Sequence, residues 1–168
     1  MARLSLTTDL PAPIGRCFDL SRDIDFHCRT MAHTGERVIA GPGLRSSGLA
    51  ELGDAITWEA RHFGVRQRLS IRITDLQRPH SFIDEMIPRR ECGHGAFTRF
   101  YHEHRFEAVR SADDPSGPLT RMTDLVTFAA PLGILGLAVE SLFLTRYMRR
   151  LLARRNELLR AALATPQP

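Results

Sequence analysis

Lysine is absent from this chain of 168 residues, so all 23 basic side chains are arginine, and asparagine occurs once, at Asn156. Such a bias reflects GC-rich codons more than a function. The formal net charge is +4, but acidic residues are interspersed among the arginines, and neither a nucleic-acid-binding motif nor a platform of stacking aromatics accompanies them. We therefore expect no nucleic-acid partner.

Cysteine and long apolar runs are also scarce. Cys17, Cys28 and Cys92 are odd in number and lack the spacing of a metal site, which fits a reducing compartment. No apolar run reaches the ~20 residues that a helix needs to cross a bilayer, and the first residues lack a signal-type apolar core. We expect a cytoplasmic protein with one domain over residues 1–164 and a disordered tail at 165–168.

The segment 96–109 reads AFTRFYHEHRFEAV and alternates as a strand does. Phe100, His102, His104 and Phe106 fall on one face, and mainly charged residues fall on the other. Burying an imidazole without a partner costs roughly 1–3 kcal/mol. The two histidines should therefore meet a hydrogen-bonding neighbour or a wet, ligand-sized cavity.

Residues 54–76 predict a β-hairpin that turns at Phe63-Gly64, where glycine supplies a positive φ. The turn pairs His62 with Val65, and counting outward it pairs Trp58 with Leu69 and Ile56 with Ile71. One face of the hairpin is thus apolar. The other face predicts a solvated charge ladder of Thr57, Glu59, Arg61, Arg66, Arg68, Arg72 and Thr74.

Two further strands flank the histidine strand. In residues 81–88 either alternate set can face inward, and we favour the set of Phe82, Asp84 and Met86. In residues 119–130 the inward row is Met122, Asp124, Val126 and Phe128. A hairpin centred near Asp114 places His104 opposite Asp124, where the carboxylate can orient or charge the imidazole.

Helices complete the predicted layout. A strand at 3–10 precedes two short helices at 14–20 and about 23–31, and an apolar stripe with helical spacing predicts a long helix over 137–163 that packs across the sheet. Its arginines are most simply a solvated face, the alternative being a patch for a membrane surface or an acidic partner. These arginines are Arg146, Arg149, Arg150, Arg154, Arg155 and Arg160.

This α+β order resembles the helix-grip architecture of the START/Bet v 1-like superfamily, also described as polyketide cyclase/dehydrase and lipid-transport (SRPBCC) proteins. The segments that carry the resemblance are AP at 12–13, CFDL at 17–20, TWEARHFG at 57–64, FIDEM at 82–86 and YMRRLL at 147–152. Segments 58–64 and 131–136 also look similar to a bacterial subgroup sometimes labelled cell-division-inhibitor-like. The resemblance implies a curved antiparallel sheet of six or seven strands wrapped around the C-terminal helix, with an apolar cavity that binds lipids, quinones or aromatic polyketides.

The inward polar and aromatic positions are the candidate site. We expect ligand contacts from Trp58, His62, Asp84, Phe100, His102, His104, Met122, Asp124 and Phe128. The plainer alternatives are a core aromatic for Trp58, a turn cap for His62, a strand-edge charge for Asp84, and a self-satisfied polar network for the remaining ionisable groups. A metal at the histidine pair is conceivable, but no motif fixes a third ligand, so we predict neither metal nor cofactor.

Three functions fit these expectations. The first, which we favour, is a binding or carrier module for a small, mostly apolar ligand bearing one or two polar groups, with at most transient membrane contact. The second is a cyclase or dehydratase in which His104, oriented by Asp124, exchanges a proton with a carbonyl-bearing substrate. The third is a protein-interaction domain linked to cell division that uses the arginine-rich helix.

Overall fold

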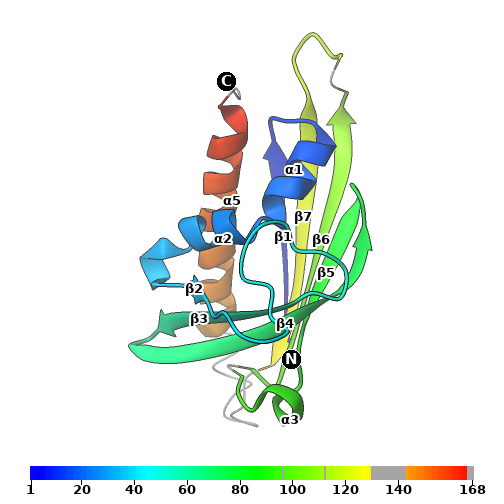
Figure 1. Ribbon diagram of the computed structural model, residues 1–168. Coiled ribbons are helices and arrows are strands. Elements are labelled where there is room, and N and C mark those ends of the chain that lie inside the picture. The colour runs from blue at the N-terminus through cyan, green and yellow to red at the C-terminus, as the bar shows by residue number, and fades with distance from the viewer. Residues whose placement is uncertain (96, 112, 130–142, 166–168) are drawn as a thin grey trace.

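The computed structural model describes residues 1–95, 97–111, 113–129 and 143–165, and its described strands form one antiparallel sheet that curves around a long helix (Figure 1). The strand order is β1-β7-β6-β5-β4-β3-β2. The strands are β1 (Ala2–Leu10), β2 (Arg37–Val38), β3 (Ala55–His62), β4 (Val65–Gln77), β5 (Ser81–Met86), β6 (Arg99–Arg110) and β7 (Leu119–Ala129). The helices are α1 (Ile14–Ser21), α2 (Ile24–Thr30), the 3-10 turn η1 (Ala32–Thr34), α3 (Arg89–Cys92) and α5 (Thr145–Ala164).

The register of the strands follows the predicted parity. The β3–β4 hairpin turns at Phe63 and Gly64, whose φ angles are 53° and 77°, as a two-residue turn with two positive φ values requires. Trp58 pairs with Leu69 as expected, and His104 lies opposite Asp124 in the β6–β7 pair. The helix-grip fold and these inward faces are therefore confirmed.

The inner face of the sheet carries two apolar core clusters with a polar layer between them. Along β6 and β7, Phe100 and Phe128 belong to the first cluster, which also takes in Leu152 of α5. Phe106 and Met122, further along the same strands, belong to the second, together with Phe18, Phe82, Leu159 and Leu163. The residues between them are His102, His104, Asp124 and the Asn156 that reaches them from α5.

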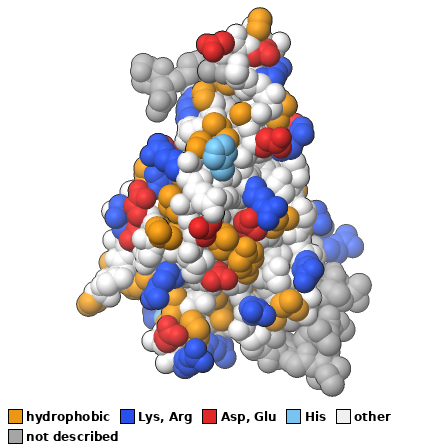
Figure 2. Space-filling view, turned by 90° about the vertical axis from the view of Figure 1, so that its right-hand side faces the viewer, with side chains coloured by type: hydrophobic (Ala, Val, Ile, Leu, Met, Phe, Trp, Pro, Cys, Tyr) orange, Lys and Arg blue, Asp and Glu red, His pale blue; other side chains and the backbone are white. Residues whose placement is uncertain are grey.

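The outer face of the hairpin differs from the prediction at two positions. Thr57 and Glu59 are each only 3% exposed, so the ladder is not solvated there. Glu59 is enclosed by the arginines that bind it, Arg37 and Arg68, and Thr57 bonds the hydroxyl of Ser70. The arginines of the ladder are exposed as expected. On the face of the molecule drawn in Figure 2, basic and acidic side chains are intermixed.

The helices lie close to their predicted positions. α1 extends one residue beyond the prediction, and Asp23 caps α2 by accepting a hydrogen bond from the backbone N–H of Phe26 at 2.9 Å. The predicted start of the last helix, near 137, falls outside the described residues. Within α5 the solvated-face prediction holds for five arginines but is wrong for Arg155, which is 6% exposed.

Candidate ligand-binding cavity

A cavity of about 430 Å³ lies between the inner face of the sheet and helices α2 and α5. Most of its wall is apolar, contributed by Ile56, Trp58, Ile71, Ile73, Phe100 and Met148. Ionisable side chains interrupt that wall, and Asp84, His102, His104 and Arg155 are among them. Apolar walls with a few convergent polar groups are typical of small-molecule sites.

Six of the nine residues predicted to contact a ligand line this cavity. They are Trp58, His62, Asp84, Phe100, His102 and His104. Met122, Asp124 and Phe128 do not line it. All three are fully buried in β7, because Met122 and Phe128 pack inside the two apolar clusters and Asn156 of α5 lies on the carboxylate of Asp124.

Asp124 holds both histidines of β6 through a single oxygen. Its Oδ1 accepts a hydrogen bond from Nε2 of His102 at 3.0 Å and lies 2.9 Å from Nδ1 of His104. The second contact is close but poorly aligned for N–H donation, so His104 Nδ1 lacks a well-formed hydrogen bond. The predicted His104–Asp124 pair therefore exists, and His102 shares it.

The other carboxylate oxygen of Asp124 faces α5. Asn156 donates from Nδ2 to Oδ2 at 2.7 Å, and Nη1 of Arg155 lies 3.8 Å from Oδ1. Neither residue was predicted from the sequence, although a signal was present. With Leu152 and Leu159 they fall at i, i+3, i+4 and i+7, so two polar side chains sit on the apolar stripe that packs against the sheet.

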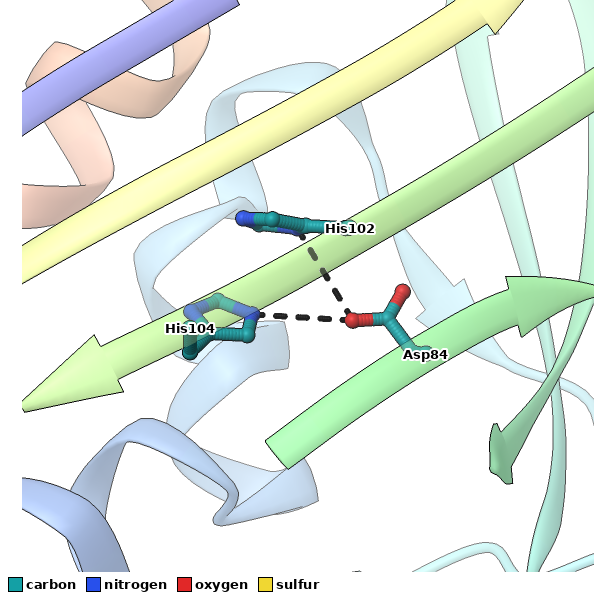
Figure 3. Close-up of side chains that lie close together, drawn as sticks. All are labelled: Asp84, His102 and His104. Carbon is teal, nitrogen blue, oxygen red and sulfur yellow. Dashed lines mark ion pairs between the residues drawn. The ribbon is translucent and has the colours of Figure 1, made fainter. Parts of the chain in front are cut away.

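On the cavity side the two imidazoles face Asp84 of β5 (Figure 3). Oδ1 of Asp84 lies 3.5 Å from Nε2 of His104 and 3.8 Å from Nδ1 of His102. The two rings are 3.8 Å apart between centroids, and Phe82 stacks on His104 at 4.2 Å. Stacking and the strand backbone together fix the orientation of His104.

The cluster separates the pKa values of its two histidines. Burial lowers the pKa of His102, and the neighbouring His104 lowers it further. Burial also acts to lower the pKa of His104, but the nearby carboxylates of Asp124 and Asp84 outweigh it, and the pKa is raised. Burial opposes ionisation of Asp124, yet the contacts with His102 and His104 hold its pKa well below the usual range.

Aromatic side chains build another part of the cavity wall. The ring of Trp58 lies against that of His27 of α2, tilted by 31° with centroids 4.3 Å apart, and Nε2 of His27 lies 2.6 Å from a carboxylate oxygen of Glu36. Nδ1 of His62 lies 2.7 Å from the hydroxyl of Tyr147, and burial lowers the pKa of His62. Trp58 thus both lines the cavity and packs against the ring of His27.

Across the described part of the chain, the helices are all too short or too polar to span a membrane. Neither a protein-family model nor a curated protein matches the sequence.

Solved structures do match, at low sequence identity. The major latex-like protein 151 of Panax ginseng superposes with a TM-score of 0.59 at 12% identity over 98% of each chain. A protein from Arthrobacter aurescens gives 0.62 at 16% identity, covering 98% of this chain and 87% of its own. A protein from Thermus thermophilus gives 0.59 at 17% identity, covering 96% of this chain and 99% of its own. The chain therefore has the helix-grip fold of the Bet v 1-like proteins.

Proposed function

We propose that this protein binds and carries a small, mostly apolar ligand, such as a lipid, a quinone or an aromatic polyketide-like molecule, in the internal cavity. The cavity carries this proposal. Its volume of about 430 Å³ lies within the ~300–1,000 Å³ of small-molecule sites. Pairing an apolar wall with buried ionisable groups favours a ligand with one polar end.

The position of the polar groups suggests how such a ligand lies. Its carbonyl or hydroxyl group points to Asp84, His102 and His104, where an imidazole N–H or a carboxylate oxygen can bond it. Its apolar or planar body lies along Trp58 and Phe100, where burial and stacking supply most of the affinity.

Intrinsic fluorescence tests this proposal, because Trp58 is the single tryptophan of the chain and lines the cavity. Titration with fatty acids, quinones and flavonoids should change its emission saturably for at least one class. The control is the double variant Trp58→Phe/Leu158→Trp, which moves the tryptophan to a partly exposed position on α5. Its emission should stay constant, and equal responses from both proteins would mean surface adsorption. Native mass spectrometry of protein purified from its own host would then identify a copurified ligand.

One observation favours a second function, proton transfer to a carbonyl-bearing substrate. His104 lines the cavity, holds a raised pKa and contacts a carboxylate, as a general acid or base requires. Its Nε2 is the nitrogen that would reach substrate, since Nδ1 faces Asp124. A cyclase or dehydratase of this kind would convert the ligands that the fluorescence assay detects, and product analysis by mass spectrometry distinguishes it from a carrier.

A further inference from the structure

Three side chains of the cavity wall direct one ligand atom each to the same small volume. These atoms are Oδ1 of Asp84, Nδ1 of His102 and Nε2 of His104, and all lie within 4.8 Å of one another (Figure 3). They come from two paired strands: Asp84 is the direct partner of His102 in the β5–β6 register, and His104 follows two residues later on the same face. The triangle is thus a consequence of sheet geometry.

The separations within the triangle are wrong for a shared proton. A hydrogen bond from nitrogen to oxygen spans roughly 2.7–3.2 Å, whereas the two nitrogens lie 3.5 and 3.8 Å from the carboxylate oxygen. Metal–nitrogen and metal–oxygen bonds of about 2.1 Å in a tetrahedral site place neighbouring ligand atoms roughly 3.4 Å apart. The two distances to the carboxylate oxygen are close to that edge, and the two nitrogens lie within 4.8 Å of each other, so a bound ion would draw the histidines together.

We propose that Asp84, His102 and His104 bind one divalent transition-metal ion such as Zn²⁺. Imidazole nitrogens suit Zn²⁺, Co²⁺, Ni²⁺ and Fe²⁺, whereas Mg²⁺ and Ca²⁺ take oxygen ligands. Two histidines and one carboxylate supply three of the four positions of a tetrahedral ion. The three residues line the cavity, so the fourth position opens into it, where a water molecule or a ligand oxygen completes the coordination.

Asp124 provides the support that such a site needs. Histidines that bind metal through one nitrogen usually give the N–H of the other to a carboxylate, which fixes the tautomer and the ring orientation. Here both far nitrogens, Nε2 of His102 and Nδ1 of His104, lie about 3 Å from Oδ1 of Asp124. His102 donates from Nε2 to Asp124, and a neutral His104 with its proton on Nδ1, beside the same oxygen, likewise leaves a lone pair on the Asp84 side. Asp124 is thus a positioning residue and not a ligand.

The metal site does not depend on the proposed apolar ligand, so it is tested with the metal alone. Protein treated with EDTA and dialysed is titrated with Co²⁺, whose tetrahedral complexes absorb strongly in the visible range. We expect one equivalent to bind with this spectrum, Zn²⁺ to displace it, and excess Mg²⁺ to leave it unchanged.

Variants localise the bound ion. Asp84→Asn preserves shape while removing the charged ligand, and His104→Gln removes an imidazole; each should weaken Co²⁺ binding at least tenfold. The matched control is His33→Gln, an exposed histidine of η1, which should bind as the unaltered protein does. Far-UV circular dichroism and the melting temperature establish whether each variant is folded. If His104→Gln does not fold, Asp84→Asn, which alters a side chain at the cavity surface, provides the test.

Two results would overturn the site. The first is the absence of a stoichiometric tetrahedral Co²⁺ spectrum in the unaltered protein. The second is equal affinity in Asp84→Asn and His33→Gln, since binding would then lie on surface histidines. Neither result bears on the apolar ligand, which is measured separately with Trp58 in metal-free protein.

Discussion

At the scale of single residues, Asp124 is the side chain on which the polar layer depends. It contacts His102, His104 and Asn156, and it lies within 3.8 Å of Arg155. It is fully buried and outside the cavity wall. A buried carboxylate in contact with two imidazoles stabilises the fold and fixes their orientation.

The first prediction concerns Asp124→Asn in metal-free protein. The variant replaces a charge-assisted acceptor by an amide, so the free energy of unfolding should fall by about 1–3 kcal/mol, while the affinity for the apolar ligand changes little. Urea unfolding and Trp58 fluorescence titration measure the two quantities. Unchanged stability with abolished ligand binding would place Asp124 in contact with ligand, against the structure. Unchanged binding with turnover lost would favour proton chemistry at His104.

A second residue-scale prediction concerns acid stability. Hydrogen bonds from Arg68 and Arg37 lower the pKa of Glu59, so its ionised form stabilises the folded state. That stabilisation is present above the pKa of an unfolded glutamate, about 4.3, and is lost as the pH falls through the lower folded pKa. Glu59→Gln should therefore be less stable than the unaltered protein at pH 7, and the gap should close in acid.

Urea unfolding at several pH values measures this gap. Glu157→Gln on the exposed side of α5 is the control. If the gap between Glu59→Gln and the unaltered protein is the same at all pH values, the arginine contacts of Glu59 do not stabilise the fold.

At the scale of elements, the sequence predicts strands and their register well. The period of two fixes which side chains share a face, and the glycine of the Phe63-Gly64 turn fixes the pairing across the hairpin, so Trp58↔Leu69 follows from counting. The His104↔Asp124 pairing also follows once the second hairpin is centred. Both depend on local backbone geometry, which the sequence encodes directly.

What covers each face depends on distant segments, and there the sequence predictions fail. The side chains of Thr57 and Glu59 point outward as expected but are buried under their neighbours. Asp124 points inward as expected but is covered by Asn156, 32 residues away. Period-two patterning specifies direction without specifying what lies opposite. The position of Asp84 beside the two histidines likewise depends on the β5–β6 register. The sequence of residues 81–88 does not determine that register, because either alternate set of its side chains can face inward.

The element-scale prediction tests the β3–β4 turn. Gly64 has a φ of 77°, and beyond its two chain neighbours no residue has an atom within 4 Å of the point that a Cβ would occupy there, so Gly64→Ala introduces backbone strain without a clash with another part of the fold. The free energy of unfolding should fall by about 1–2 kcal/mol. The control is Gly15→Ala in α1, also free of contacts within 4 Å, which should stabilise by roughly 0.5–1 kcal/mol because alanine favours a helix. Thermal and urea unfolding of both variants measure these changes. An unchanged free energy of unfolding in Gly64→Ala would contradict the turn geometry.

At the scale of the whole molecule, the sheet and α5 leave a space that neither core cluster fills. The polar layer lies between the clusters and opens toward the cavity through Asp84, His102 and His104. Apolar side chains packed onto these groups would remove them from water or ligand without replacing their hydrogen bonds, at a cost of about 1–3 kcal/mol for each group left unpaired. Keeping the cavity open thus leaves packing energy unused.

The last prediction tests this unfilled space with Ala60→Leu. Ala60 is 7% exposed and lines the cavity, so a leucine there fills part of the space and adds buried CH₂ groups, each contributing about 0.8 kcal/mol. We expect the ligand-free variant to melt at a higher temperature and to bind the apolar ligand at least tenfold more weakly. Ala161→Leu, on the exposed surface of α5, should change neither quantity. If Ala60→Leu is more stable yet binds ligand as tightly as the unaltered protein, the ligand occupies another site. If Ala60→Leu is less stable, the leucine overpacks its surroundings, and the free space beside Ala60 is smaller than a cavity of about 430 Å³ implies.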